Sequence, residues 1–168
     1  MVSAAIVSTG LVGSAGAAEV SKEVKEAIEI FQKADTGLKK QFKEAQGYAV
    51  FPSVSKGAVG VGGAHGKGQV FQKGKLIGEA SLSQVTVGLQ LGGQVYSELI
   101  FFETKEALES FKGSKLAMSA QVSAVAAAEG AAQNAKYQQG VAVFTIAKGG
   151  LMYEASVGGQ KFKFTPSK

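Results

Sequence analysis

The first regular pattern along the chain is that of an amphipathic helix over residues 20–46. Apolar side chains recur there every three or four residues, and lysines and glutamates occupy the opposite face. Ser21 is placed to act as the N-cap. Asp35-Thr36-Gly37 predicts a break into two helices, because glycine in a helix interior costs about 1 kcal/mol relative to alanine. We expect the apolar face of this segment to cover a sheet.

The middle of the chain predicts β-strands separated by glycine-rich turns. Residues 48–54 predict a strand that ends, or lies at an edge, near Pro52, because proline offers no N–H to a neighbouring strand. Lys73-Gly74 lies between two short apolar runs and predicts a hairpin. Residues 85–91 alternate strictly between apolar and polar or small residues, as in a strand. Residues 99–102 are apolar on both faces and predict a central strand.

The second half of the chain is less uniform. Thr104 is a suitable N-cap for a short helix. Residues 116–132 leave two alternatives open, since their alanine content favours a helix and their alternation favours a strand. Residues 141–146 and 151–157 flank Lys148-Gly149-Gly150 and predict a second hairpin. The chain then ends in alternating lysine and phenylalanine, and neither a fixed repeat nor a linker divides it.

Together these elements predict a single α+β domain. Its centre is a strongly curved, glycine-rich antiparallel sheet that tends towards a barrel. An N-terminal helical segment packs against the sheet, and a short helix follows the central strand. Glycine makes up 23 of the 168 residues, about twice its average share. This enrichment supports the curvature, because bending a sheet requires bulges and glycine kinks.

Residues 1–18 carry no charge and end in small residues before Glu19, which resembles the apolar region and cleavage site of a secretory signal. The usual positive segment is missing, so either the true start lies upstream or the signal is weak. A transmembrane helix is the alternative. We expect export, with cleavage near Ala18. Residues 19–168 would then form the domain, in the periplasm or associated with the cell envelope.

The chain is basic, with a net charge of +5 and a pI of about 9.3, and every basic residue is lysine. The absence of arginine excludes bidentate guanidinium recognition of phosphate or guanine, and we expect no nucleic-acid partner. Diffuse attraction to anionic surfaces remains open, beside the simpler interpretation of a solvated lysine surface. The absence of cysteine excludes thiolate metal sites and cysteine nucleophiles.

The motifs of common enzymes are missing from the sequence. The glycine series at residues 62–68 lacks the spacing of a phosphate-binding loop and of a dinucleotide fingerprint. No Gly-x-Ser-x-Gly segment occurs. His65 is the only histidine and cannot form a multi-histidine metal site. We therefore expect no catalysis, no cofactor and no metal. Backbone amides of the glycine series could still hold a lipid phosphate, although a plain turn region explains it as well.

Several separated segments, in a fixed order along the chain, resemble the SYLF domain family, also called the Ysc84-type or Las17-binding actin-regulator domain. These segments are Ala45–Pro52, Lys56-Gly57, the glycines up to Gly68, Ser83–Gln94, Ala128-Glu129-Gly130 and Ala147–Glu154. The resemblance spans about residues 20–165. It implies binding to membrane lipids and, for bacterial members, export. The Trp-Ser pair of eukaryotic members and the basic N-terminal segment linked with actin in fungal members have no match here, so we expect neither actin binding nor a phosphoinositide preference.

These observations suggest five lysines as lipid-binding residues. Lys39, Lys40 and Lys43 lie on one helical turn, and Lys56 and Lys67 flank the glycine series. Near an anionic bilayer each lysine contributes about 1 kcal/mol. The expected partner is an anionic phospholipid surface. The alternative function is a structural or protein-binding module of the periplasm, which would use a strand edge or an apolar patch.

Overall fold

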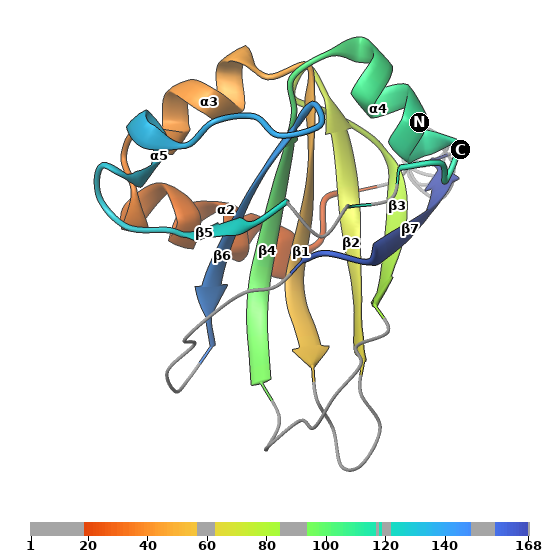
Figure 1. Ribbon diagram of the computed structural model, residues 1–168, viewed down its shortest axis with the longest axis horizontal. Coiled ribbons are helices and arrows are strands. Elements are labelled where there is room, and N and C mark those ends of the chain that lie inside the picture. Colours follow the sequence, from red (N-terminus) through yellow and green to blue (C-terminus); the bar gives the residue numbers. More distant parts are fainter. Residues whose placement is uncertain are drawn as a thin grey trace, which may run out of the picture.

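The computed structural model describes residues 19–56, 63–84, 94–116, 118, 122–148 and 157–167. The strands in these ranges form one seven-stranded sheet in the order β5-β6-β4-β1-β2-β3-β7 (Figure 1). The strands are β1 (Gly47–Lys56), β2 (Ala64–Gln72), β3 (Lys75–Gln84), β4 (Gln94–Phe102), β5 (Ala124–Ala126), β6 (Val141–Ala147) and β7 (Gln160–Pro166). The helices are α2 (Lys22–Ala34), α3 (Leu38–Glu44), α4 (Lys105–Lys112) and α5 (Ala131–Asn134).

The prediction of an α+β domain with a strongly curved sheet is confirmed, with two refinements. The sheet is mixed rather than wholly antiparallel, because β5 pairs with β6 in parallel. It is also open among the described strands, with β5 and β7 at its edges. The paired strands β1 and β4, which contribute buried residues to both faces, lie at the centre, as predicted for residues 99–102.

The curvature is visible in contacts between distant strands. The ring centroids of Phe51 on β1 and Phe162 on β7 are 5.9 Å apart, although three strand spacings in a flat sheet would separate them by about 14 Å. Phe111 of α4 packs on the same face, with its ring 5.0 Å from both Phe162 and Phe102. The face that carries these rings is the concave face of the sheet.

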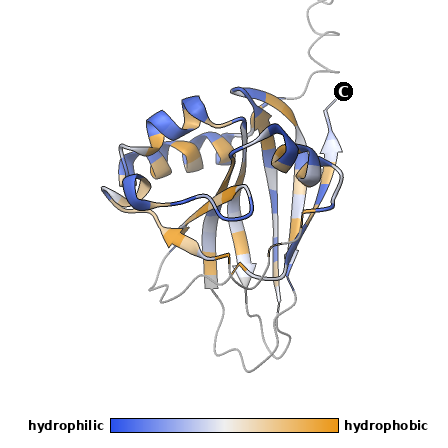
Figure 2. Cartoon of the chain, turned by 45° about the horizontal axis from the view of Figure 1, so that its top comes forward, coloured by the Kyte–Doolittle hydropathy of each residue, from blue (hydrophilic) through white to orange (hydrophobic). Residues whose placement is uncertain are grey.

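The opposite, convex face has its own core. Val50 and Leu99 are fully buried there against the apolar sides of α2 and α3, which contribute Phe31 and Leu38. In Figure 1 these helices lie behind and to one side of the strands. Figure 2 shows the hydrophobic sides of the helices turned towards the sheet and the hydrophilic sides turned outwards. The expectation that the N-terminal helices cover the sheet is met.

The predicted break between the helices is present, and Asp35 explains its function. This carboxylate is fully buried and accepts hydrogen bonds from the backbone N–H groups of Gly37, Gly130 and Ala132, at 3.0, 3.3 and 2.6 Å. In the opposite direction, Glu129 in the turn before α5 accepts hydrogen bonds from the backbone N–H and the hydroxyl of Thr36. The two acids thus lock the junction of α2 and α3 to the turn before α5.

Pro52 does not lie at an edge, so that prediction was wrong. Strand β1 lies between β4 and β2, and it continues past the proline to Lys56. Three residue steps on β1, from Val50 to Ser53, face two steps on β2, which identifies a β-bulge. The bulge removes the need for an N–H at this position. The Ser97 hydroxyl donates to the Pro52 carbonyl oxygen at 2.8 Å and replaces a ladder hydrogen bond.

The local turn and cap predictions are confirmed. Ser21 accepts a hydrogen bond from the N–H of Val24, and Thr104 accepts one from the N–H of Ala107, both at 3.1 Å. Lys73 and Gly74 have φ of 52° and 80°, as in a tight hairpin turn between β2 and β3.

For one segment neither predicted alternative is correct, and other predictions concern residues outside the described ranges. Within residues 116–132 the described part contains only the short β5 and the start of the four-residue α5, so it is neither one helix nor one strand. The strand predicted at 85–91, the second arm of the hairpin at 151–156 and the signal at 1–18 lie outside the described residues and stay predictions.

Close approach of two backbones explains one of the strand glycines. A Cβ atom at Gly68 on β2 would collide with the carbonyl oxygen of Val50 on β1. The carbonyl oxygen belongs to the backbone of a central strand, so it cannot move aside easily. Only glycine fits this position, and here the glycine enrichment serves the bend of the sheet.

We predict that Asp35→Ala lowers the free energy of unfolding by about 3 kcal/mol, because it leaves three backbone N–H groups without their charged acceptor. Urea denaturation at pH 7 measures the change. Glu29→Ala, which removes an exposed acid from α2, is the matched control and should change stability by less than about 0.5 kcal/mol. Equal effects of the two substitutions would contradict the structural role of Asp35.

Candidate anion-binding cleft

Helix α3 presents lysines to solvent because its apolar side is fully used. Leu38 and Phe42 are buried against the convex face. Lys39 and Lys43 are exposed and four residues apart, so they lie on the same side of the helix. Two like charges at this spacing disfavour a helix slightly. The packing of Leu38 and Phe42 offsets that cost.

The β2–β3 hairpin brings a third lysine to the same place. The N–H of Lys73 donates to the carbonyl oxygen of Gln46, which follows α3, at 3.2 Å. This bond fixes the turn beside the C-terminal end of the helix. The left-handed backbone of Lys73 is part of the same turn. A residue 30 positions away from Lys43 in the sequence therefore lies next to it in space.

The three lysines surround a cleft of about 620 Å³. Its described lining consists of Gln32, Lys39, Phe42, Lys43, Tyr48, Lys73 and Gly74. None of these residues is acidic, so three positive charges face the cleft without a compensating carboxylate in its wall. Such a grouping favours an anionic ligand.

Aromatic rings form the floor of the cleft. The Tyr48 ring stacks on Phe71 with centroids 4.9 Å apart and contacts the edge of Phe42 at 4.8 Å. The Tyr48 side chain is largely buried, and burial raises the pKa of its phenol. The hydroxyl is thus a neutral donor at physiological pH. It forms no hydrogen bond with the described part of the chain, so it can donate to a ligand.

The five lysines suggested by the sequence do not gather in one place. Lys39 and Lys43 line the cleft, whereas Lys40 is exposed on α3 but absent from the lining. Lys67 lines a different hollow, on the convex face of β2. Lys56 lies at the far end of β1, nine residues or about 30 Å along the strand from Gly47.

Sequence reasoning missed the five other members of the cleft, which are Gln32, Phe42, Tyr48, Lys73 and Gly74. Lys73 carried a signal, since it was recognised as a turn residue, but nothing in a local pattern shows which helix a turn will contact. His65 is exposed on β2. The described ranges contain no group of three or more His, Asp or Glu side chains able to hold a metal ion. Across the same ranges, every helix is too short or too polar to cross a membrane.

Comparison with known proteins places the chain in a family. The model of the Ysc84 family, described as Las17-binding protein actin regulator, matches residues 83–167. The chain belongs to the Ysc84 family. The resemblance seen in the sequence is thereby confirmed. The matched segment contains β4, α4, β6 and β7 but neither α3 nor the Lys73 turn, so the cleft is assigned from the geometry of this Ysc84-family chain alone.

A curated relative extends the similarity towards the N-terminus. "Beta cell expansion factor A" of Aeromonas veronii is 32% identical over 154 residues, which cover 84% of this chain and 58% of the relative. The chain therefore spans less than two thirds of the relative's length. What the relative's name describes is a property of that protein.

We predict that ionisation of the Tyr48 phenol lowers the stability of the protein in alkaline solution. The folded-state pKa of its phenol is raised, so its contribution to stability is fully present below pH 10, the ordinary value, and is lost as pH rises through the folded-state pKa. Tyr48→Phe removes this titration. Between pH 10 and 11 the unfolding free energy of the variant should fall less steeply, by up to about 1.4 kcal/mol per pH unit. Urea denaturation at pH 9, 10 and 11 tests this, and parallel curves would contradict it.

Proposed function

We propose that this protein is a non-catalytic domain of the bacterial cell envelope that binds anionic phospholipid headgroups in the cleft between α3 and the β2–β3 turn. The grouping of Lys39, Lys43 and Lys73 around a wall without acids carries the proposal. Membership of the Ysc84 family is consistent with it. The uncharged segment at residues 1–18 supports placement in the envelope.

The chemistry of the cleft fits a lipid phosphate. A phosphodiester carries one negative charge and unprotonated oxygens that accept hydrogen bonds. Lysine ammonium groups and the Tyr48 hydroxyl supply donors, and the Gln32 amide adds another at the rim. Three lysines near an anionic surface contribute about 3 kcal/mol together. This energy supports reversible attachment that depends on salt, rather than permanent anchoring.

The floor of the cleft favours a surface-bound ligand rather than a deeply buried one. Phe42 and Tyr48 are held by ring contacts with Phe101 and Phe71. The backbone that carries Lys39 and Lys43 is therefore mounted on a packed base and need not rearrange when a headgroup binds. Such pre-organisation increases affinity without adding contacts.

The test is co-sedimentation with vesicles of phosphatidylcholine that contain increasing fractions of phosphatidylglycerol. We predict that binding rises with the anionic fraction and falls as salt rises. The triple variant Lys39→Gln, Lys43→Gln, Lys73→Gln should weaken binding by about a hundredfold, since it removes about 3 kcal/mol.

The matched control is Lys105→Gln, Lys112→Gln, Lys115→Gln, which removes the same charge from α4 and the residues after it. It should change binding severalfold at most. Equal losses in the two triple variants would show that only net charge matters and would refute the cleft. Binding that ignores lipid charge would favour the alternative of a protein-binding module.

A further inference from the structure

A groove runs across the convex face of the sheet beside α2, away from the α3 cleft. It consists of two hollows of about 360 and 550 Å³ that share Glu23 and Pro52. The smaller hollow extends towards β6 and the larger one towards β7. Both hollows border Glu23 and Pro52, so they lie side by side along α2, and together we call them the α2 groove.

One row of paired residues forms the base of the α2 groove. In order across the strands the row is Ile146, Ser97, Pro52-Ser53, Lys67, Ser81 and Lys163. It crosses β6, β4, β1, β2, β3 and β7. Five strand spacings give a length of about 24 Å, which suits an extended chain with a headgroup.

The wall of the groove is fixed in place. Gln69 on β2 is buried and holds the start of α2 by two bonds: the Ser21 N–H donates to its Oε1 at 2.8 Å, and its Nε2 donates to the Glu19 carbonyl oxygen at 2.9 Å. Val24 and Ala27 then pack on the sheet. The groove is thus a preformed feature of the fold.

The end near β6 has an apolar strip. Ala27, Ile30, Pro52, Ile146 and Ala147 line the smaller hollow, and Glu23, Glu26, Ser97 and Lys148 complete its lining. Ile30 is 48% exposed. Among the large hydrophobic residues in the described ranges, only Ile30 and Val95 are exposed. Covering such a side chain with an apolar ligand is favourable. A volume of about 360 Å³ lies at the low end for ligand sites and suits one acyl chain rather than two.

The end near β7 carries mixed charge. Lys67 and Lys163 lie on either side of Ser81 in the same row, and neither forms an ion pair with the described residues. Glu79, which is paired with Thr165 in the next row, and Glu23 of α2 also line this end. Two positive and two negative side chains therefore surround one hollow. This pattern complements a headgroup that itself bears both charges.

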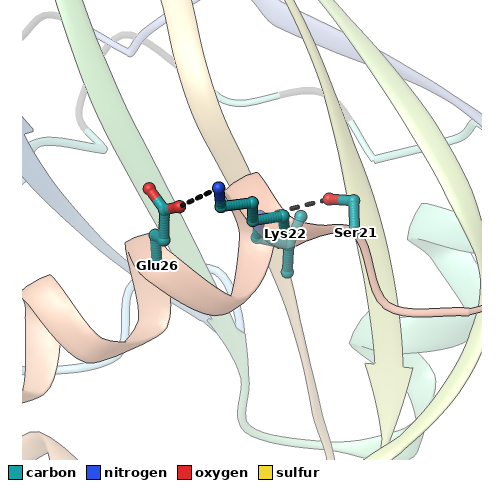
Figure 3. A network of polar contacts seen from close by, with 4 residues as sticks. Ser21, Lys22 and Glu26 are labelled. Carbon is teal, nitrogen blue, oxygen red and sulfur yellow. Dashed lines mark hydrogen bonds and ion pairs between the residues drawn. The ribbon is translucent and has the colours of Figure 1, made fainter.

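The remaining acid of the groove is already paired. Glu26 lies at the apolar end, and its carboxylate is 4.0 Å from the ammonium group of Lys22 (Figure 3). The pair is exposed and weak, but it offsets the negative charge beside the acyl chain. Lys148 also borders this end, and Glu23 lies between the two hollows, whereas Lys67, Lys163 and Glu79 line the β7 end alone.

We propose that the α2 groove binds a single-chain phospholipid with a zwitterionic headgroup, of the lysophosphatidylethanolamine type. The acyl chain lies along Ile30 and Ile146, the phosphate lies between Lys67 and Lys163, and the ammonium group faces Glu23 and Glu79. This site goes beyond the proposed function, because it takes a different headgroup, holds a single molecule and uses none of the α3 lysines.

The test is isothermal titration calorimetry of the full chain with lysophosphatidylethanolamine below its micelle-forming concentration. We expect one ligand per chain. Ile30→Gln and the double variant Lys67→Gln, Lys163→Gln should each weaken binding about tenfold. Two matched controls should leave it unchanged: Val95→Gln, an exposed apolar residue outside the groove, and Lys161→Gln, on β7 but outside the lining. Circular dichroism confirms that each variant is folded.

Several outcomes would overturn the proposal. Absence of binding would do so directly, as would equal losses in the groove variants and their controls. If a fatty acid or lysophosphatidylglycerol of the same chain length bound as tightly, recognition of a zwitterionic headgroup would be refuted. Loss of binding in the α3 triple variant would place the ligand in the other site. Because this test uses dispersed ligand and no vesicles, its failure is distinguishable from failure of membrane binding.

Discussion

The structure depends on two central strands that are apolar on both faces. On β4, Leu99 and Phe101 point to the convex side and Ile100 and Phe102 to the concave side, and all four are fully buried. A sheet of this kind cannot leave either face to water, because each exposed phenylalanine or leucine would forfeit about 1.5–3 kcal/mol. The curl of the sheet covers one face, and α2 and α3 cover the other. Every other element is placed by this requirement.

The same requirement decides where ligands can bind. The apolar side of helix α3 packs on the sheet, so its lysines face outwards. The turn that contains Lys73 lies beside them. Helix α2 is short and covers the convex face only partly, which leaves a groove beside it. The bulge at Pro52 lies in the middle of that groove. Both candidate sites are therefore consequences of how the core is covered.

Local chemistry was predictable from the sequence, and long-range placement was not. Ser21, Thr104 and the Lys73-Gly74 turn act within three or four residues of themselves, so their roles follow from short patterns. Pro52 was misplaced at an edge because a bulge, which depends on the partner strands, cannot be read from one strand. Likewise, the helical pattern of residues 38–44 identified Lys39 and Lys43 as neighbours. Their proximity to Lys73 depends on the tertiary fold and could not be predicted from that pattern. The alanine-rich segment around residue 124 pairs with β6 by contacts that no periodicity reveals.

The central claim is that a fixed lysine cleft, rather than overall charge, meets the anionic membrane. Amide hydrogen exchange of the full chain, with and without nanodiscs of phosphatidylglycerol, tests it most directly. We predict added protection at residues 39–48 and in the turn between β2 and β3, with α4 unchanged. Protection spread evenly over the exposed lysines, or concentrated on α4, would contradict it.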